Sequence, residues 1–385
     1  GKSVTIEGGT IEVGAGGIVL GADVTFRNVA LSFNTSVRNA IVANGYTLTL
    51  ENVTCSNHSF NLFCGSLIDS NSEGLTVPAP GPGGTIIIRG NTTIQGTDSY
   101  GSGNIYAGNL SMGGMDGEHN GTEDNAPPNV YSGDASIRIE GSAGGDALGT
   151  VYACGAQQRI PVGQQGGKIT RDNPRDYTVS GSVTITGEVP GVYGAGSAKT
   201  EVVFRGDGNQ AARTYVDLSS LSVETGNLFL KEGSRFRDEK ALSLAAGARL
   251  NLSAFEALTG FPAVGDFTGG GLVILGEGQT WAISGAVSGE TAVAIGGVNY
   301  TETESTGLPR AGHSYLQAPN SGGSAFRLLP YPTQPDSQLV RGEDGRWTVS
   351  GGSAGTALVR SFRFETGELT FDPDSGSEAE FPLEV

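Results

Sequence analysis

A short alternation of polar and apolar positions recurs along the chain. Its form is a polar residue, an aliphatic residue, any residue, an aliphatic residue, any residue and then Gly or Asn, as in SIRIEG at 136–141. A period of two places Ile137 and Ile139 on one face of a β-strand and their neighbours on the other. The closing Gly or Asn permits the positive φ of a tight corner. Each copy therefore predicts a strand followed by a corner.

The copies recur at intervals whose lower bound is near 20 residues. Successive starts lie 20, 24, 38, 51, 46, 19, 19, 21 and 30 residues apart, at Ser3, Asp23, Thr47, Thr85, Ser136, Ser182, Glu201, Ser220, Ala241 and Gly271. The longer intervals are interpreted as one unit plus an insertion. A unit of about 20 residues can hold three short strands with bends, stacked on the next unit at about 4.8 Å. The spacing predicts an all-β, parallel solenoid.

This periodicity and its Gly or Asn corners resemble the right-handed parallel β-helix proteins of the pectin-lyase-like class, and in particular the adhesin-like surface proteins of bacteria built on that scaffold. The resemblance covers residues 1–285 and includes no catalytic motif. It implies a right-handed parallel β-helix in a secreted or cell-surface protein. Leucine-rich repeats share the period, but their L-x-x-L-x-L signature is missing here.

The repeated pattern stops after residue 285. Runs such as RWTVSGG and GELTFDP then alternate as ordinary strands between turn residues. We expect a smaller antiparallel β-domain over 286–385, either sandwich-like or a cap on the open end of the solenoid, because an exposed end invites edge-to-edge association. Trp281 and Trp347 are expected to be core anchors.

A second phrase recurs as NIYAGN at Asn104, TVYACG at Thr150 and GVYGAG at Gly191. If each phrase is a later strand of its unit, Tyr106, Tyr152 and Tyr193 occupy equivalent positions on three successive units and form a ladder. An outward ladder could stack against sugar rings, which makes these tyrosines candidate ligand-binding residues. The alternative is an aromatic stack that points inward or packs at a corner and fills the core.

Two long insertions follow the first two tyrosine phrases, at 109–135 and 155–181. Both leave the same corner of adjacent units, so we expect them to lie side by side and to carry the binding function.

The first insertion contains oxygen donors at spacings that imitate a calcium-binding loop. The candidate metal ligands are Asp116, Glu118, Asn120 and Asp124. The imitation is incomplete because Pro127 stands where a bidentate Glu is expected. The loop is therefore either a Ca²⁺ site or a solvated acidic segment.

The second insertion contains Arg171 and Arg175, which are candidate ligand-binding residues. Exposed ion pairs with the acidic first insertion are the alternative, and such pairs contribute only about 0–1 kcal/mol each.

Composition narrows the class of partner. The net charge is −17, from 40 acidic and 23 basic residues, which argues against a nucleic-acid partner because phosphate backbones would be repelled. No stretch approaches 18 continuous apolar residues, so membrane insertion is not expected. The three cysteines, Cys55, Cys64 and Cys154, form no paired framework. They are interpreted as small buried hydrophobes, with a Cys55–Cys64 disulfide as the alternative.

The sequence thus favours a non-catalytic, adhesin-like protein that is secreted or bound to a bacterial cell surface. Its expected partner is an extracellular polysaccharide or a host glycoprotein, bound through the two insertions, and no cofactor other than Ca²⁺ is considered. A polysaccharide lyase or glycoside hydrolase on the same scaffold is the first alternative, but the strand faces offer no clear Asp cluster for the chemistry. A structural stalk is the second alternative.

Overall fold

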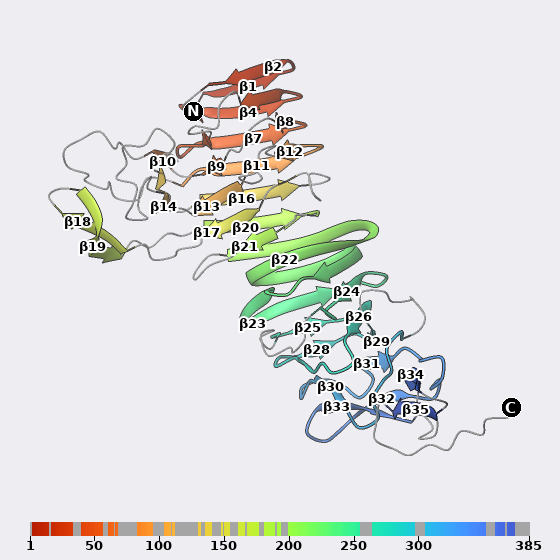
Figure 1. Cartoon of the computed structure of the whole chain (residues 1–385). Coiled ribbons are helices and arrows are strands. Elements are labelled where there is room, and N and C mark those ends of the chain that lie inside the picture. Colours follow the sequence, from red (N-terminus) through yellow and green to blue (C-terminus); the bar gives the residue numbers. More distant parts are fainter. Residues whose placement is uncertain are drawn as a thin grey trace.

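The structure is a computed structural model of the chain (Figure 1). It describes residues 2–14, 17–33, 40–56, 61–64, 66–67, 83–94, 104–108, 110–111, 130–131, 135–140, 148, 150–154, 161–165, 168–176, 181–188, 191–193, 199–254, 264–296, 305–351, 359–365 and 368–373. Within these ranges the regular elements are β-strands and there is no helix, so the expected all-β class is confirmed. In Figure 1 the strands are stacked along a rod, with the N-terminus near one end.

Most strands belong to three rows, within which each strand pairs in parallel with the strand one repeat further along the chain. The first row contains the predicted strands, namely β1 (Ser3–Glu7), β4 (Asp23–Arg27), β7 (Thr47–Glu51), β11 (Thr85–Arg89), β16 (Ala135–Glu140), β20 (Gly181–Thr186), parts of β22 (Lys199–Leu230), β23 (Arg235–Leu244), β25 (Phe267–Thr268) and β28 (Val287–Ser288).

The second row consists of strands that follow a first-row strand after its corner. Its members are β2 (Thr10–Val13), β5 (Ala30–Phe33), β8 (Thr54–Ser56) and β12 (Thr93–Ile94), and further along the chain the end of β22, β24 (Arg249–Asn251), β26 (Leu272–Leu275), β29 (Thr291–Ile295) and β31 (Phe326–Leu328).

The third row completes each repeat and contains the tyrosine phrases. Its members are β3 (Ile18–Val19), β6 (Ala40–Val42), β9 (Asn61–Phe63), β13 (Asn104–Gly108), β17 (Val151–Cys154), β21 (Gly191–Tyr193) and part of β22. This large parallel sheet is compatible with a parallel β-helix.

Alternation within the strands builds the core, as the pattern predicts. In β16, Ile137 and Ile139 are buried, whereas Arg138 between them is exposed. Successive units place Ile86, Ile137 and Val183 in register, all fully buried. Full burial of an aliphatic side chain contributes about 1.5–3 kcal/mol, so these in-register columns stabilise the stacking.

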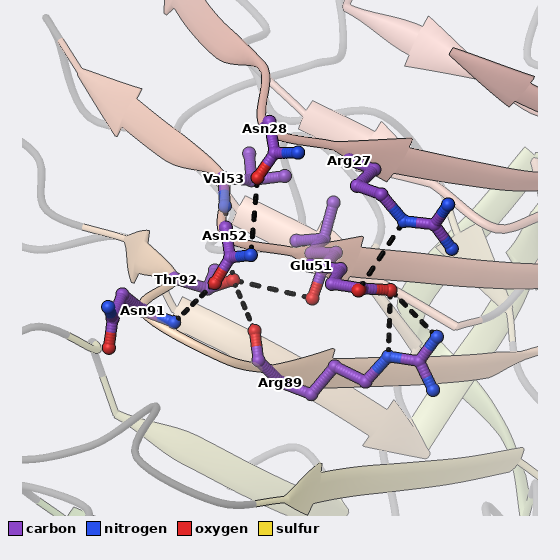
Figure 2. A network of polar contacts seen from close by, with 9 residues as sticks. Arg27, Asn28, Glu51, Asn52, Val53, Arg89, Asn91 and Thr92 are labelled. Atoms are coloured by element: carbon purple, nitrogen blue, oxygen red, sulfur yellow. Dashed lines mark hydrogen bonds and ion pairs between the residues drawn. The ribbon is translucent and has the colours of Figure 1, made fainter. Parts of the chain in front are cut away.

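The corner after each of the first four first-row strands is left-handed. Gly8, Asn28, Asn52 and Gly90 have φ of 73°, 54°, 55° and 65°, and we call them the corner column. This confirms the predicted role of the closing Gly or Asn. Figure 2 shows that part of the column is also joined by hydrogen bonds: Asn52 Nδ2 donates to Asn28 Oδ1 at 3.2 Å, and the backbone N–H of Asn91, which follows Gly90, donates to Asn52 Oδ1 at 2.9 Å.

The register departs from the predicted alignment at two places. Ser182 pairs with Lys199 and not with Glu201, so EVVFRG is displaced by two residues. A displacement of two keeps the same side chains inward, which is why the pattern could not exclude it. GLVILG forms β26, which pairs with β24 in the second row and not with the copy at Ala241.

Among the described residues, four groups of strands lie outside the rows. They are the antiparallel sheet of β10 (Ser66–Leu67), β14 (Leu110–Ser111) and β15 (Val130–Tyr131), the hairpin of β18 (Pro161–Gln165) and β19 (Lys168–Asp176), and toward the C-terminus the sheet of β27 (Trp281–Ala282), β30 (Ser314–Gln317), β32 (Gln338–Arg341) and β33 (Arg346–Ser350) with the separate hairpin β34 (Val359–Glu365) and β35 (Glu368–Pro373).

The C-terminal sheet is mostly antiparallel and packs against the last parallel strands. Trp281 and Trp347 are fully buried there, as expected, and the Trp347 ring meets Phe326 of β31 edge-on at 5.1 Å. Parallel pairing itself continues to β29 and β31, beyond residue 285. The domain boundary at 285 stays a prediction.

The cysteines are structural where their side chains are described. Cys55 and Cys64 are both free and buried, so the alternative of a disulfide between them is wrong. Burial raises the pKa of the Cys55 thiol to about 12, and burial also raises that of Cys64. Both therefore remain protonated at neutral pH and act as small apolar groups.

Candidate functional site

The three predicted tyrosines form a continuous ladder on the third row. Tyr106 pairs in register with Tyr152, and Tyr152 with Tyr193. The ring centroids lie 4.8 and 5.2 Å apart with interplanar angles of 10° and 24°. The spacing follows directly from parallel strands paired at about 4.8 Å. These residues are the tyrosine ladder.

The ladder points away from the main core. On either side of Tyr106, Ile105 and Ala107 are fully buried in that core, whereas the tyrosines themselves are half-buried. Tyr106 instead packs on Val42 and Phe63, which form a separate apolar cluster. The inward form of the alternative is therefore wrong for this ladder, whereas a stack that packs at a corner stays a prediction.

Phe63 extends the tyrosine ladder by one aromatic ring, and the sequence pattern of the tyrosine phrases did not lead us to predict it. Its ring stacks on Tyr106 with centroids 5.1 Å apart, and it is almost completely buried. The signal was present, since NLFCG at Asn61 has the same form as NIYAG at Asn104. Phe63 fixes one end of the ladder without exposing an edge to solvent.

Stacking along the ladder limits the chemistry it can perform. Both faces of the Tyr152 ring are covered by neighbouring tyrosines. A sugar ring cannot therefore lie flat on it, and a ligand could reach this partly exposed side chain only at its edge. Burial, and to a smaller extent the neighbouring Tyr193, raise the pKa of Tyr152. The phenol stays neutral at physiological pH and can both donate and accept hydrogen bonds.

The two insertions contain the remaining predicted site residues. Asp116, Glu118, Asn120 and Asp124 lie outside the described residues, so the predicted Ca²⁺ loop stays a prediction. Arg171 and Arg175 belong to β19, of which the structure describes the backbone. In Figure 1, β14 of the first insertion and the β18–β19 hairpin of the second extend to the same side of the rod, on which β13 and β17 are labelled.

A mixed-charge cavity lies further along the rod, on β22. It has a volume of about 440 Å³ and is lined by polar groups that include Glu188, Asp207, Arg213 and Lys231. The Arg213 side chain is only 7% exposed and its Nη2 lies 3.3 Å from Glu188 Oε2. Two acids and two bases balance one another, so the cavity presents no net charge to a ligand.

An alternating charge ladder runs beside the corner column. Glu7, Arg27, Glu51, Arg89 and Glu140 lie in register at the ends of successive first-row strands. Figure 2 shows Glu51 between two arginines, with carboxylate oxygens 2.8 Å from Arg89 Nη2 and 3.4 Å from Arg27 Nε. The hydrogen bond from Arg89, together with both positive charges, lowers the pKa of Glu51. Glu51 thus joins Arg27 and Arg89 of the two neighbouring strands, so we assign these three ions a structural role.

In the described part of the chain, no three His, Cys, Asp or Glu side chains are grouped so that they could hold a metal ion. No helix described there has the length and apolar character that crossing a membrane requires.

Comparison with known proteins gave no further guide to the site. No protein-family model, curated protein or solved structure matches the chain.

Proposed function

We propose that this chain is a right-handed parallel β-helix that binds a linear extracellular polysaccharide along the tyrosine ladder, without acting on it. It belongs to the secreted or cell-surface class of adhesin-like bacterial proteins. The observation that supports this proposal is the row of partly exposed, evenly spaced tyrosines outside the main core.

The spacing of the three tyrosine rings favours an extended polymer over a compact ligand. One pyranose unit is about as long as the separation of neighbouring rungs, so each unit of a chain lying along the rod meets one phenol of Tyr106, Tyr152 or Tyr193. Hydroxyl-rich ligands suit neutral phenols, which donate and accept hydrogen bonds. The insertions at 109–135 and 155–181 would then form the side walls of the binding surface.

Charge favours a neutral polysaccharide. The chain has a net charge of −17, which opposes the approach of a polyanion such as a polyuronate. Arg171 and Arg175 lie on the β18–β19 hairpin, which extends to the side of the rod on which β13 and β17 are labelled in Figure 1. They would select among neutral chains or bind sparse acidic substituents.

The test is titration calorimetry of the whole chain against neutral and acidic polysaccharides. We expect a neutral chain to bind, and Tyr152→Ala to weaken binding by about tenfold or more. Tyr152→Phe keeps the stacked ring and removes only the hydroxyl, so it should weaken binding by about threefold to tenfold. The matched control is Tyr46→Ala, because Tyr46 is exposed and lies off the ladder; binding should not change.

Uronate release is followed in parallel to test the lyase alternative. Unsaturated products from an acidic polysaccharide would replace the proposal with that enzyme. If no polysaccharide binds, or if both Tyr152 variants bind as the wild type does, the ladder is a packing device and the chain is better described as a stalk.

A further inference from the structure

The mixed-charge cavity on β22 forms where one repeat is shorter than the next. Four residues lie between Thr186 of the first row and Gly191 of the third, whereas ten residues lie between their partners Val203 and Thr214 in the following repeat. This longer connection supplies most of the lining, namely Asp207, Asn209, Gln210, Ala211, Ala212 and Arg213. The cavity is therefore built by the course of the backbone.

One pair of charges in the cavity is held in place by several contacts. The Arg213 side chain is nearly buried, its Nη2 lies 3.3 Å from Glu188 Oε2, and its Nη1 donates to the carbonyl oxygen of Ala212 at 3.0 Å. The Glu188 Oε1 lies against the backbone at Gly206, where an added Cβ would be 2.8 Å from it. These two ions neutralise one another and fix the shape of this part of the cavity.

A polar group also lies next to this pair on its buried side. The Tyr215 side chain is fully buried, and its hydroxyl has no hydrogen-bond partner among the residues that the structure describes. Burial raises the pKa of Tyr215, and the charges of Arg213 and Glu188 act on that pKa in opposite directions, so the three groups lie close together. The surroundings of the pair are therefore polar, which favours a charged ligand over an apolar one.

The other two charges of the cavity are exposed. The Asp207 carboxylate accepts hydrogen bonds from the backbone N–H and the Nδ2 of Asn209, at 2.9 and 3.2 Å, but both donors are uncharged. The backbone N–H of Lys231 donates to the carbonyl oxygen of Arg213, which places residue 231 beside Arg213. In the described part of the chain, neither Asp207 nor Lys231 lies within ion-pair distance of an opposite charge. The cavity therefore offers one negative and one positive group that do not neutralise each other.

We propose that this cavity binds a small zwitterion, such as a free amino acid, with its ammonium group at Asp207 and its carboxylate at Lys231. A neutral sugar would leave both charges without a partner, and a singly charged ligand would leave one, so a zwitterion matches the cavity best. Both ions are hydrated before binding, so we expect a dissociation constant in the millimolar range. None of the ladder tyrosines lines this cavity, so it is a second site beyond the polysaccharide surface.

The test is a ligand-observed NMR titration of the whole chain with zwitterions of increasing charge separation, namely glycine, β-alanine and 4-aminobutyrate. Butylamine and butyrate carry one charge each on a chain of the same length as 4-aminobutyrate, and glucose carries none. We expect a zwitterion to bind about threefold to tenfold more tightly than either singly charged compound, because each of those contacts only one of the two free ions.

Two neutralising substitutions identify the two ends of the site. Lys231→Gln and Asp207→Asn should each weaken zwitterion binding by about threefold to tenfold. Lys231→Gln should also shift the preference toward butylamine and Asp207→Asn toward butyrate, which a general loss of structure would not do. Both side chains are exposed, so the variants should fold. Lys199→Gln is the matched control, because Lys199 lies on β22 outside the cavity and pairs with Glu201; binding should not change.

Failure of all three zwitterions to bind would overturn the proposal, as would a preference between butylamine and butyrate that neither substitution changes. Glucose that binds as tightly as the best zwitterion would replace the proposal with a sugar site. Tyr152→Ala should leave zwitterion binding unchanged, so this proposal and the polysaccharide proposal can fail independently.

Discussion

At the residue scale, the decisive positions are those where the backbone turns. Asn28 and Asn52 adopt φ near 55°, a conformation that costs a residue other than Gly about 1–2 kcal/mol. Asn tolerates it because its short amide forms local hydrogen bonds. Here the amide of Asn52 also joins neighbouring repeats, as Figure 2 shows. One side chain thus shapes a corner and ties it to the next.

We expect Asn52→Ala to lower the free energy of unfolding by about 2–3 kcal/mol, because it introduces left-handed strain and removes the amide hydrogen bonds. Asn52→Gly keeps the conformation accessible and should cost only about 1 kcal/mol. Urea unfolding followed by circular dichroism measures both. Equal losses in the free energy of unfolding for the two variants would show that the left-handed conformation at residue 52 contributes nothing to the difference between Ala and Gly.

At the element scale, the strands are short, and each is stabilised by the parallel strands that pair with it on either side. We call the repeats that contain these paired strands neighbouring rungs. Close approach between rungs depends on glycine at certain corners. Gly289 has φ of 79°, and a Cβ there would collide with the carbonyl oxygen of Gly269 on the neighbouring rung. Gly247 has a similar φ of 81°, yet a Cβ there would meet open space. The two positions therefore separate backbone strain from rung-to-rung contact.

Gly289→Ala should destabilise the chain by about 2–5 kcal/mol, because it adds an overpacked contact to the left-handed strain. The control Gly247→Ala carries the strain alone and should cost about 1–2 kcal/mol. Differential scanning calorimetry of both variants checks the difference. A loss at Gly247 as large as the loss at Gly289 would contradict the requirement for close rung contact.

The sequence predicted the strands and corners well because both are local. The period of two identified the inward side chains of β16 correctly, and Tyr106, Tyr152 and Tyr193 were correctly placed in register. The assignment of β26 to its row failed, because buried strands of all rows share the same apolar pattern. The fifth letter of the repeated motif alternates between Glu and Arg in its first five close copies, and this signal of the charge ladder was overlooked.

At the scale of the whole molecule, each repeat is stabilised chiefly by its neighbours. Stability in such an array is approximately a sum of terms from each unit and from each contact between units. Among the described residues β1 pairs with β4 alone and exposes Val4 and Ile6, whereas β7 pairs with a strand on both sides. Opening should therefore begin at the N-terminal end.

Hydrogen exchange with mass spectrometry tests this gradient. In this chain, amides of β1 and β2 should exchange at least about tenfold faster than those of β7 and β11. Uniform protection from β1 through β11 would contradict the nearest-neighbour account.

The sequence by itself determined the all-β class, the period near 20 residues, the left-handed corners and the spacing of the tyrosines. Each depends on neighbouring residues or on repetition, which a linear pattern records. Only the tertiary structure decided that the tyrosine ladder faces away from the core and that its rings cover one another. It also showed that Cys55 and Cys64 are unbridged, and that β1 is left with core side chains in solvent. These features depend on what packs beside a strand, and a local pattern of apolar and polar residues does not specify that neighbour.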